Sequence, residues 1–122
     1  MRLSTSASVL AALAWSLAAA GAHAHTRLEK ATPADNAVLS EAPRELALEF
    51  SKVARVTAVT LQRAGEEQVI KVGTLPKALA TKHTIPLTAL RPGKYLVNWR
   101  VLSADNHVLS GKLRFTLAAA AQ

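Results

Sequence analysis

Apolar residues at every second position are the feature that most constrains how this chain folds. In KYLVNWRVL, residues 94–102, Tyr95, Val97, Trp99 and Val101 share one face of an extended chain. The same alternation recurs in ELALEF at 45–50, TAVTLQ at 57–62, EQVIKV at 67–72 and KLRFTL at 112–117. Alternation over short runs is typical of strands with one buried face. The sequence therefore predicts an all-β fold.

Helix and strand breakers separate these runs. They are Pro33, Pro43, Pro76, Pro86 and the pair Pro92-Gly93. Proline and glycine mark connections between elements, and six or seven short strands joined in this way favour a Greek-key β-sandwich or small barrel. One stretch, ALAT at 78–81, is compatible with a short turn of helix.

The first 24 residues are predicted to be a signal peptide and residues 25–122 a single domain. Arg2 supplies a positive charge, residues 8–20 form a short apolar run, and Ala-x-Ala tripeptides follow at Ala18, Ala20 and Ala22. This is the pattern of a cleaved secretory signal. An uncleaved anchor is the alternative, but a membrane span needs roughly 20 apolar residues and this run is shorter.

Composition limits the chemistry of the exported part. There is no cysteine, and the one methionine is Met1, so a metal site must use nitrogen and oxygen donors. The formal net charge is +7, and the basic residues are spread along the sequence. Because a nucleic-acid footprint needs a basic patch with aromatic residues, no nucleic-acid partner is expected. Weak attraction to anionic lipid headgroups remains open.

The segment SADNHVLSG, 103–111, contains a possible metal-ligand pair. Asp105 and His107 are two residues apart, so in an extended chain their side chains point to the same side. A carboxylate and an imidazole placed in this way can reach one metal ion. The competing interpretation is an ordinary turn, because Asp-Asn is a turn-forming pair. His83, in the polar stretch TKHT, is interpreted as an ordinary surface or half-buried residue.

The position of signal cleavage decides whether this pair has a strong partner. Cleavage after Ala24 makes His25 the first residue, and its α-amine and imidazole can then chelate one metal ion. Together with His107 and Asp105 this gives three nitrogens and one oxygen, a set that suits tetragonal Cu(II). Cleavage after Ala22 or Ala20 instead makes a histidine the third residue of the mature chain. We favour cleavage after Ala24, which follows the last Ala-x-Ala tripeptide.

Longer motifs resemble the CopC copper-resistance family. HTRLEKATPADNAVLSEAP at 25–43, then ELALEFS, and later GKYLVNWRVLSADNHVLSGKLRF at 93–115 carry the resemblance, which spans nearly all of residues 25–122. It implies an immunoglobulin-like or cupredoxin-like Greek-key fold and a periplasmic protein for copper resistance, buffering or transfer. It also implies a possible CopD-type inner-membrane partner.

The resemblance further implies a histidine brace, with one Cu(II) per mature chain held by His25, Asp105 and His107. Some relatives hold Cu(I) in a methionine-rich loop, which this chain lacks. We expect a monomer that binds copper and has no catalytic residues. Two alternatives are a histidine-brace copper oxygenase and a structural β-sandwich without metal. A further expectation is that the uncleaved precursor shows at most part of the site, because His25 then has no free amine.

Overall fold

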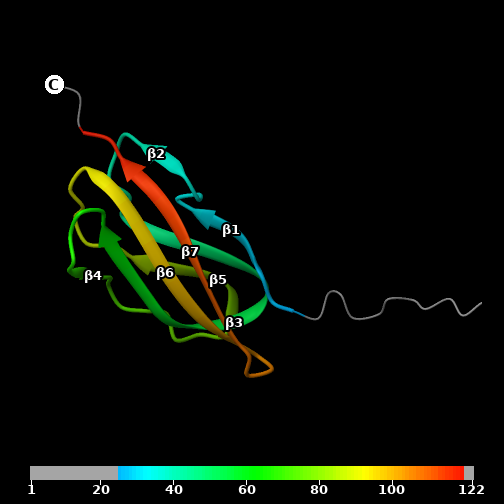
Figure 1. The fold of residues 1–122 in the computed structure, drawn as a ribbon. Helices are drawn as coiled ribbons and strands as arrows, with labels where there is room; N and C mark the ends of the chain where they lie inside the picture. The colour runs from blue at the N-terminus through cyan, green and yellow to red at the C-terminus, as the bar shows by residue number, and fades with distance from the viewer. Residues whose placement is uncertain (1–24, 120–122) are drawn as a thin grey trace, which may run out of the picture.

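One strand of 19 residues, β3, organises the molecule. The computed structural model describes residues 25–119. Its strands are β1 (Leu28–Thr32), β2 (Ala37–Leu39), β3 (Glu45–Arg63), β4 (Val69–Lys71), β5 (Ala80–Pro86), β6 (Gly93–Ser103) and β7 (Val108–Leu117). The strand order is β1-β3-β6-β7-β2, and β4 and β5 also pair with β3. The strands form a curled sheet (Figure 1), which confirms the predicted all-β Greek-key sandwich or barrel of six or seven strands.

The two halves of β3 belong to different layers. Residues 45–50 pair with β1 and β5, whereas residues 54–63 pair with β6 and residues 60–62 with β4. Between the halves, at 51–53, inward and outward positions stop alternating and the register with β5 shifts. The runs ELALEF and TAVTLQ, expected as two strands, are therefore one bent strand that passes between the layers.

The alternating apolar residues form one core inside this curl. The side chains of Tyr95, Val97, Trp99 and Val101 are buried, as the pattern in β6 predicted. The ring of Trp99 packs edge-on against Phe50 with centroids 5.4 Å apart. Within residues 25–119, the buried apolar side chains lie between positions 46 and 117.

Gly111 is required by the packing of Trp99. The two residues are opposite each other in the β6–β7 register, and a Cβ atom on Gly111 would lie 2.3 Å from the indole ring. Non-bonded carbon atoms do not approach this closely, so the indole ring needs a residue without a side chain at position 111. This fixes β7 against β6 along the hairpin that leads to residues 103–107.

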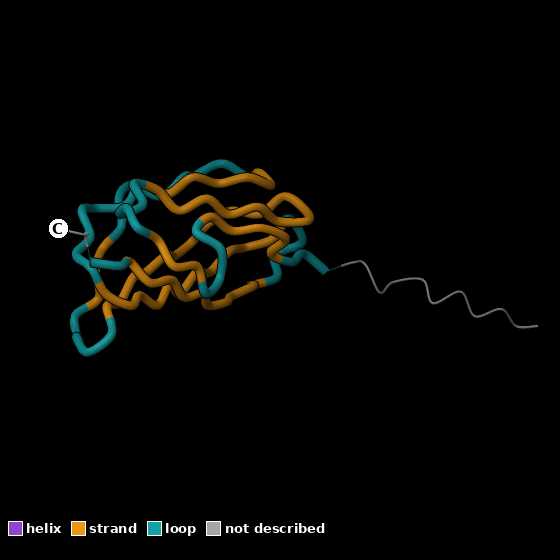
Figure 2. Tube along the Cα trace, turned by 90° about the horizontal axis from the view of Figure 1, so that it is seen from above, coloured by secondary structure: helices purple, strands orange, loops and turns teal. Residues whose placement is uncertain are grey.

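Two smaller expectations were wrong. Residues 25–119 contain no helix (Figure 2), and within the ALAT stretch Ala80 begins strand β5. His83 is buried, with 3% of its surface exposed. Its Nε2 lies 2.8 Å from the carbonyl oxygens of both Ala54 and Ala80, so this ring nitrogen has partners away from water.

No helix in the described part of the chain is long and apolar enough to cross a membrane.

Candidate metal centre

Asp105 and His107 meet in the turn that joins β6 to β7. The His107 Nδ1–H donates to Asp105 Oδ2 at 2.8 Å, so the two side chains lie together as expected. They do so through a turn and not along an extended strand. The Asn106 N–H donates to the Ser103 carbonyl at 3.0 Å and the Ser103 N–H to the His107 carbonyl at 2.9 Å. Asn106 has φ 66°, a left-handed conformation that asparagine tolerates.

Ser103 holds both members of the pair and was not singled out from the sequence. Ser103 is the last residue of β6, and its side chain points inward and is buried. The hydroxyl donates to Asp105 Oδ1 and accepts the backbone N–H of His107 at 3.1 Å. The signal for this role is the alternation in β6, which continues from Val101 to place Ser103 inward. Ser103 is therefore a positioning residue for the turn.

The electrostatics of the turn keep Asp105 ionised. The hydrogen bond from the Ser103 hydroxyl, followed by that from the His107 ring, lowers the pKa of Asp105 from 3.8 to about 2. Both hydrogen bonds favour the charged carboxylate. The side chains of His107 and Asp105 are 77% and 61% exposed, so an ion in solution can approach them directly.

His25 lines the same hollow as this pair. The hollow measures about 260 Å³ and is lined by His25, Thr26, Ser103, Asp105, His107, Val108 and Leu109. Figure 1 shows the first described residues, in blue, at the same end of the molecule as the β6–β7 turn, in orange. Two hydrogen bonds between Arg27 and Ser51 hold this end of the chain against β3. The Ser51 N–H donates to the Arg27 carbonyl at 2.9 Å, and the Arg27 N–H donates to Ser51 Oγ at 3.0 Å.

The three predicted ligands are not assembled as a finished site. Among residues 25–119, no three His, Cys, Asp or Glu side chains are grouped closely enough to hold a metal ion. In the chain of 122 residues the nitrogen of His25 is still bonded to Ala24, so the amine that would complete the set does not exist. The cleavage site itself lies outside the described residues and stays a prediction.

A larger hollow at the other end of β6 has the wrong chemistry for a metal. It measures about 500 Å³ and is lined mainly by residues of β3, β6 and β7 together with Gly65 and Glu66. Its one carboxylate, Glu66, already accepts from Arg63 and Arg91. Donor type, and not volume, therefore selects the hollow that contains His25.

Comparisons with known proteins point to one family. The family profile described as the CopC domain matches residues 28–118. The chain is 31% identical over 121 residues to copper resistance protein C of Xanthomonas campestris pv. juglandis, covering 91% of this chain and 94% of the relative. It is also 31% identical over 113 residues to protein YobA of Escherichia coli K12, covering 88% and 90%.

Solved structures share the fold. The crystal structure of CopC from Methylosinus trichosporium OB3b matches with a TM-score of 0.70 and 23% identity, covering 80% of this chain and 98% of that one. The crystal structure of PcoC, a methionine-rich copper resistance protein from Escherichia coli, matches with a TM-score of 0.62 and 25% identity. That match covers 76% of this chain and 98% of the other.

Proposed function

The chain belongs to the CopC family, and from this premise we propose that it is an exported copper-resistance protein that binds one Cu(II) ion. The proposed ligands are the amine and imidazole of His25, the imidazole of His107 and the carboxylate of Asp105. The observation that carries the proposal is the exposed Asp105–His107 pair, whose contact is 2.8 Å, in a hollow that His25 also lines.

The donor set fits cupric ion. Imidazole, amine and carboxylate donors suit tetragonal Cu(II), whereas Cu(I) prefers thiolate or thioether sulfur. Two ligand atoms at right angles, each about 2.0–2.1 Å from a metal ion, lie roughly 2.9 Å apart. Asp105 Oδ2 and His107 Nδ1 lie 2.8 Å apart, so both can bind one ion once Nδ1 releases the proton that it now donates to Asp105.

His25 is proposed to supply two nitrogens once the chain is cut after Ala24. Its imidazole and new amine belong to one residue, so one chelate ring orders both donors and limits the entropy lost on binding. The residue is exposed beside the turn, and no strand has to open for it to approach His107. Removing residues 1–24 therefore converts a partial site into a complete one.

This chain departs from its methionine-rich relative. PcoC is described as a methionine-rich copper resistance protein, but here the only methionine is Met1, within the proposed signal peptide. A thioether site for Cu(I) is therefore not proposed. The protein is proposed to work in the periplasm as a monomer that buffers Cu(II) or passes it to a CopD-type membrane protein, without nucleic-acid binding or catalysis.

The test compares residues 25–122 with the same chain lengthened by Ala24. Both forms keep every side chain of the proposed site, and only the position of the free amine differs. We expect the form that begins at His25 to bind one Cu(II), and the lengthened form to bind at least about 100-fold more weakly, because the free amine moves to Ala24 and His25 no longer chelates through its own amine and imidazole. Equal affinities in a competition titration would exclude the amine as a ligand.

A mass measurement on the exported protein locates the natural cleavage site. We expect the mass of residues 25–122, and a mass for a chain beginning at Thr26 or later would contradict the proposed ligand set.

The oxygenase alternative predicts peroxide or oxygen consumption by the copper form with a reductant. We expect no more consumption than with the His107→Ala variant.

A further inference from the structure

Basic residues that are scattered in the sequence gather on one face of the folded molecule. This cationic face is the outer surface of strands β4, β3, β6, β7 and β2, defined by Arg55, Lys71, Lys94, Arg100, Lys112 and Arg114. All six are exposed. They alternate along the strands with core residues, so period-two placement turns all of them outward.

The cross-strand register shows how evenly the charges are spread. Successive rows across the face read Arg55–Leu102–Val108, Ala58–Arg100–Ser110, Lys71–Thr60–Asn98–Lys112, Val69–Gln62–Leu96–Arg114 and Lys94–Thr116–Val38. Every row contains at least one cation, and none of these described rows contains a carboxylate. The face therefore presents one sign of charge along its whole length.

The outer face of the other layer is different. There Glu49 of β3 is opposite Lys30 of β1 on one side and Lys82 of β5 on the other. Both signs of charge alternate across this row. The contrast shows that the one-sided charge belongs to a particular face and does not simply follow from the net charge of +7.

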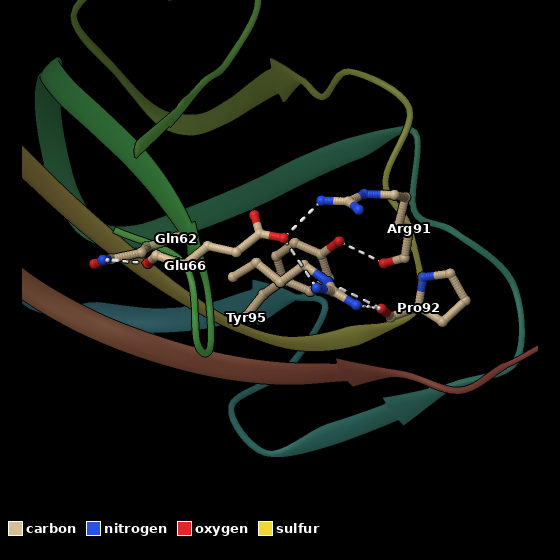
Figure 3. A network of polar contacts seen from close by, with 6 residues as sticks. Gln62, Glu66, Arg91, Pro92 and Tyr95 are labelled. Carbon is tan, nitrogen blue, oxygen red and sulfur yellow. Dashed lines mark hydrogen bonds and ion pairs between the residues drawn. The ribbon is translucent and has the colours of Figure 1, made fainter. Parts of the chain in front are cut away.

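Two carboxylates at the border of the cationic face, Glu66 and Asp35, are already occupied. Figure 3 shows the Glu66 carboxylate pointing toward Arg91. Its Oε1 accepts from Arg63 Nη1 at 3.0 Å and from Arg91 Nη2 at 2.6 Å. Asp35 accepts the backbone N–H of Arg114 at 2.8 Å. Because one carboxylate serves two guanidinium groups, the Glu66 cluster adds positive charge to this end of the face.

Apolar side chains and hollows accompany the cations. Val38, Val69 and Val108 are 74%, 53% and 65% exposed on this face, and they are three of the five exposed large apolar residues in the described chain. Two hollows of about 500 and 470 Å³ lie between the rows. Lys94 and Arg114 line the first, and Arg100 and Lys112 line the second.

We propose that the cationic face is a docking surface for a membrane that carries anionic phospholipid headgroups. Basic side chains attract an anionic bilayer surface, and exposed aliphatic side chains beside them enter its interfacial region. Nucleic acid fits less well, because all four aromatic residues of the described chain are buried and none is left to stack on bases. The proposal is independent of copper binding.

The test measures binding of metal-free residues 25–122 to vesicles. One vesicle preparation contains equal parts of phosphatidylglycerol and phosphatidylcholine, and the other contains phosphatidylcholine alone. We expect binding to the anionic vesicles only, and its loss when ionic strength rises from about 0.05 M to about 0.5 M, since exposed charges are screened. Equal binding to both vesicles, or to neither, would overturn the proposal.

Two double variants locate the surface while keeping the net charge equal. Each lysine at an anionic surface contributes about fivefold to partitioning, so K94Q/K112Q should weaken binding by about 25-fold. K30Q/K82Q removes the same charge from the other layer and should change it less than about twofold. Equal weakening by both would contradict a defined face. If the protein binds poly-glutamate but not the vesicles, the partner of the cationic face would be an acidic polypeptide instead.

Discussion

His83 in strand β5 and His107 in the β6–β7 turn show how surroundings assign a role to a histidine side chain. His83 belongs to β5, opposite Leu48 of β3, and only 3% of its surface is exposed. Its Nε2 faces two backbone carbonyl oxygens and its ring packs edge-on to Phe50 at 6.1 Å. His107 is at a turn with 77% of its side chain exposed, and its contact is a carboxylate.

The difference teaches that access and neighbouring donors, and not the residue type, make a metal ligand. The Nε2 of His83 is committed to the backbone at the point where β3 leaves the β5 register. His107 instead shares its hollow with Asp105 and His25. His83 is therefore a structural residue, and His107 is the proposed ligand.

Replacing His107 is expected to have the largest effect on copper. His107→Ala removes one of the proposed nitrogen donors and should lower Cu(II) affinity by at least about 100-fold, or about 2.7 kcal/mol. Stability should hardly change, because an exposed side chain away from caps and core contributes within about 0.5 kcal/mol. A competition titration and urea unfolding measure the two quantities. Unchanged affinity would remove the distinction between the two histidines.

Lowering the pH should weaken copper binding through the nitrogen donors. Protons compete with the metal for imidazole and amine, so affinity should fall by about 100-fold or more as pH drops from about 7.5 to about 5.5, through the ordinary histidine range. Asp105, with its pKa lowered to about 2, stays ionised throughout this window. Titrations across pH check this, and a fall only below about pH 4 would implicate carboxylates instead.

Replacing His83 should have the opposite profile. His83→Ala leaves the carbonyls of Ala54 and Ala80 without their imidazole donor and opens a cavity beside Phe50. The expected loss is about 2 kcal/mol of unfolding free energy, measured by urea denaturation. The fraction that remains folded should bind Cu(II) as the parent does. A variant that is equally stable but binds copper poorly would reverse the two roles.

Removing the hydroxyl of Ser103 should give the smallest of these effects. Outer-shell groups that orient ligands typically change metal affinity by 10–100-fold. Because His107 still contacts Asp105 in its absence, Ser103→Ala should fall near the lower limit, about tenfold. The pKa of Asp105 should rise towards its ordinary 3.8, since the Ser103 hydrogen bond is the first cause of its depression. NMR titration of the carboxyl measures this, and an unchanged pKa would contradict the assigned role.

The sequence predicted the parts of the fold that depend on local period. The alternation in 94–102 identified the buried face of β6, and the Asp-Asn pair indicated, as the competing interpretation, the turn that holds the proposed ligands. It also contained an unused indication for His83, which is two residues before the buried Ile85 and therefore on the same face of β5. Its polar neighbours in TKHT obscured that alternation.

Long-range placement could not be predicted in this way. Nothing in residues 51–53 indicates that β3 continues through a bend, because only pairing with β1, β5 and β6 keeps the strand extended there. The cationic face likewise arises from the register of strands that are distant in sequence. The proposed cleavage beside His25 would be a processing event, which the fold does not encode.

The most direct test of the copper site is electron paramagnetic resonance of residues 25–122 loaded with one equivalent of Cu(II). The account predicts a tetragonal signal with coupling to nitrogen donors from the His25 amine, the His25 imidazole and the His107 imidazole. Selective ¹⁵N labelling of histidine should change all of these couplings, and His107→Ala should remove one. A spectrum that is the same in the parent and in His107→Ala would contradict the account.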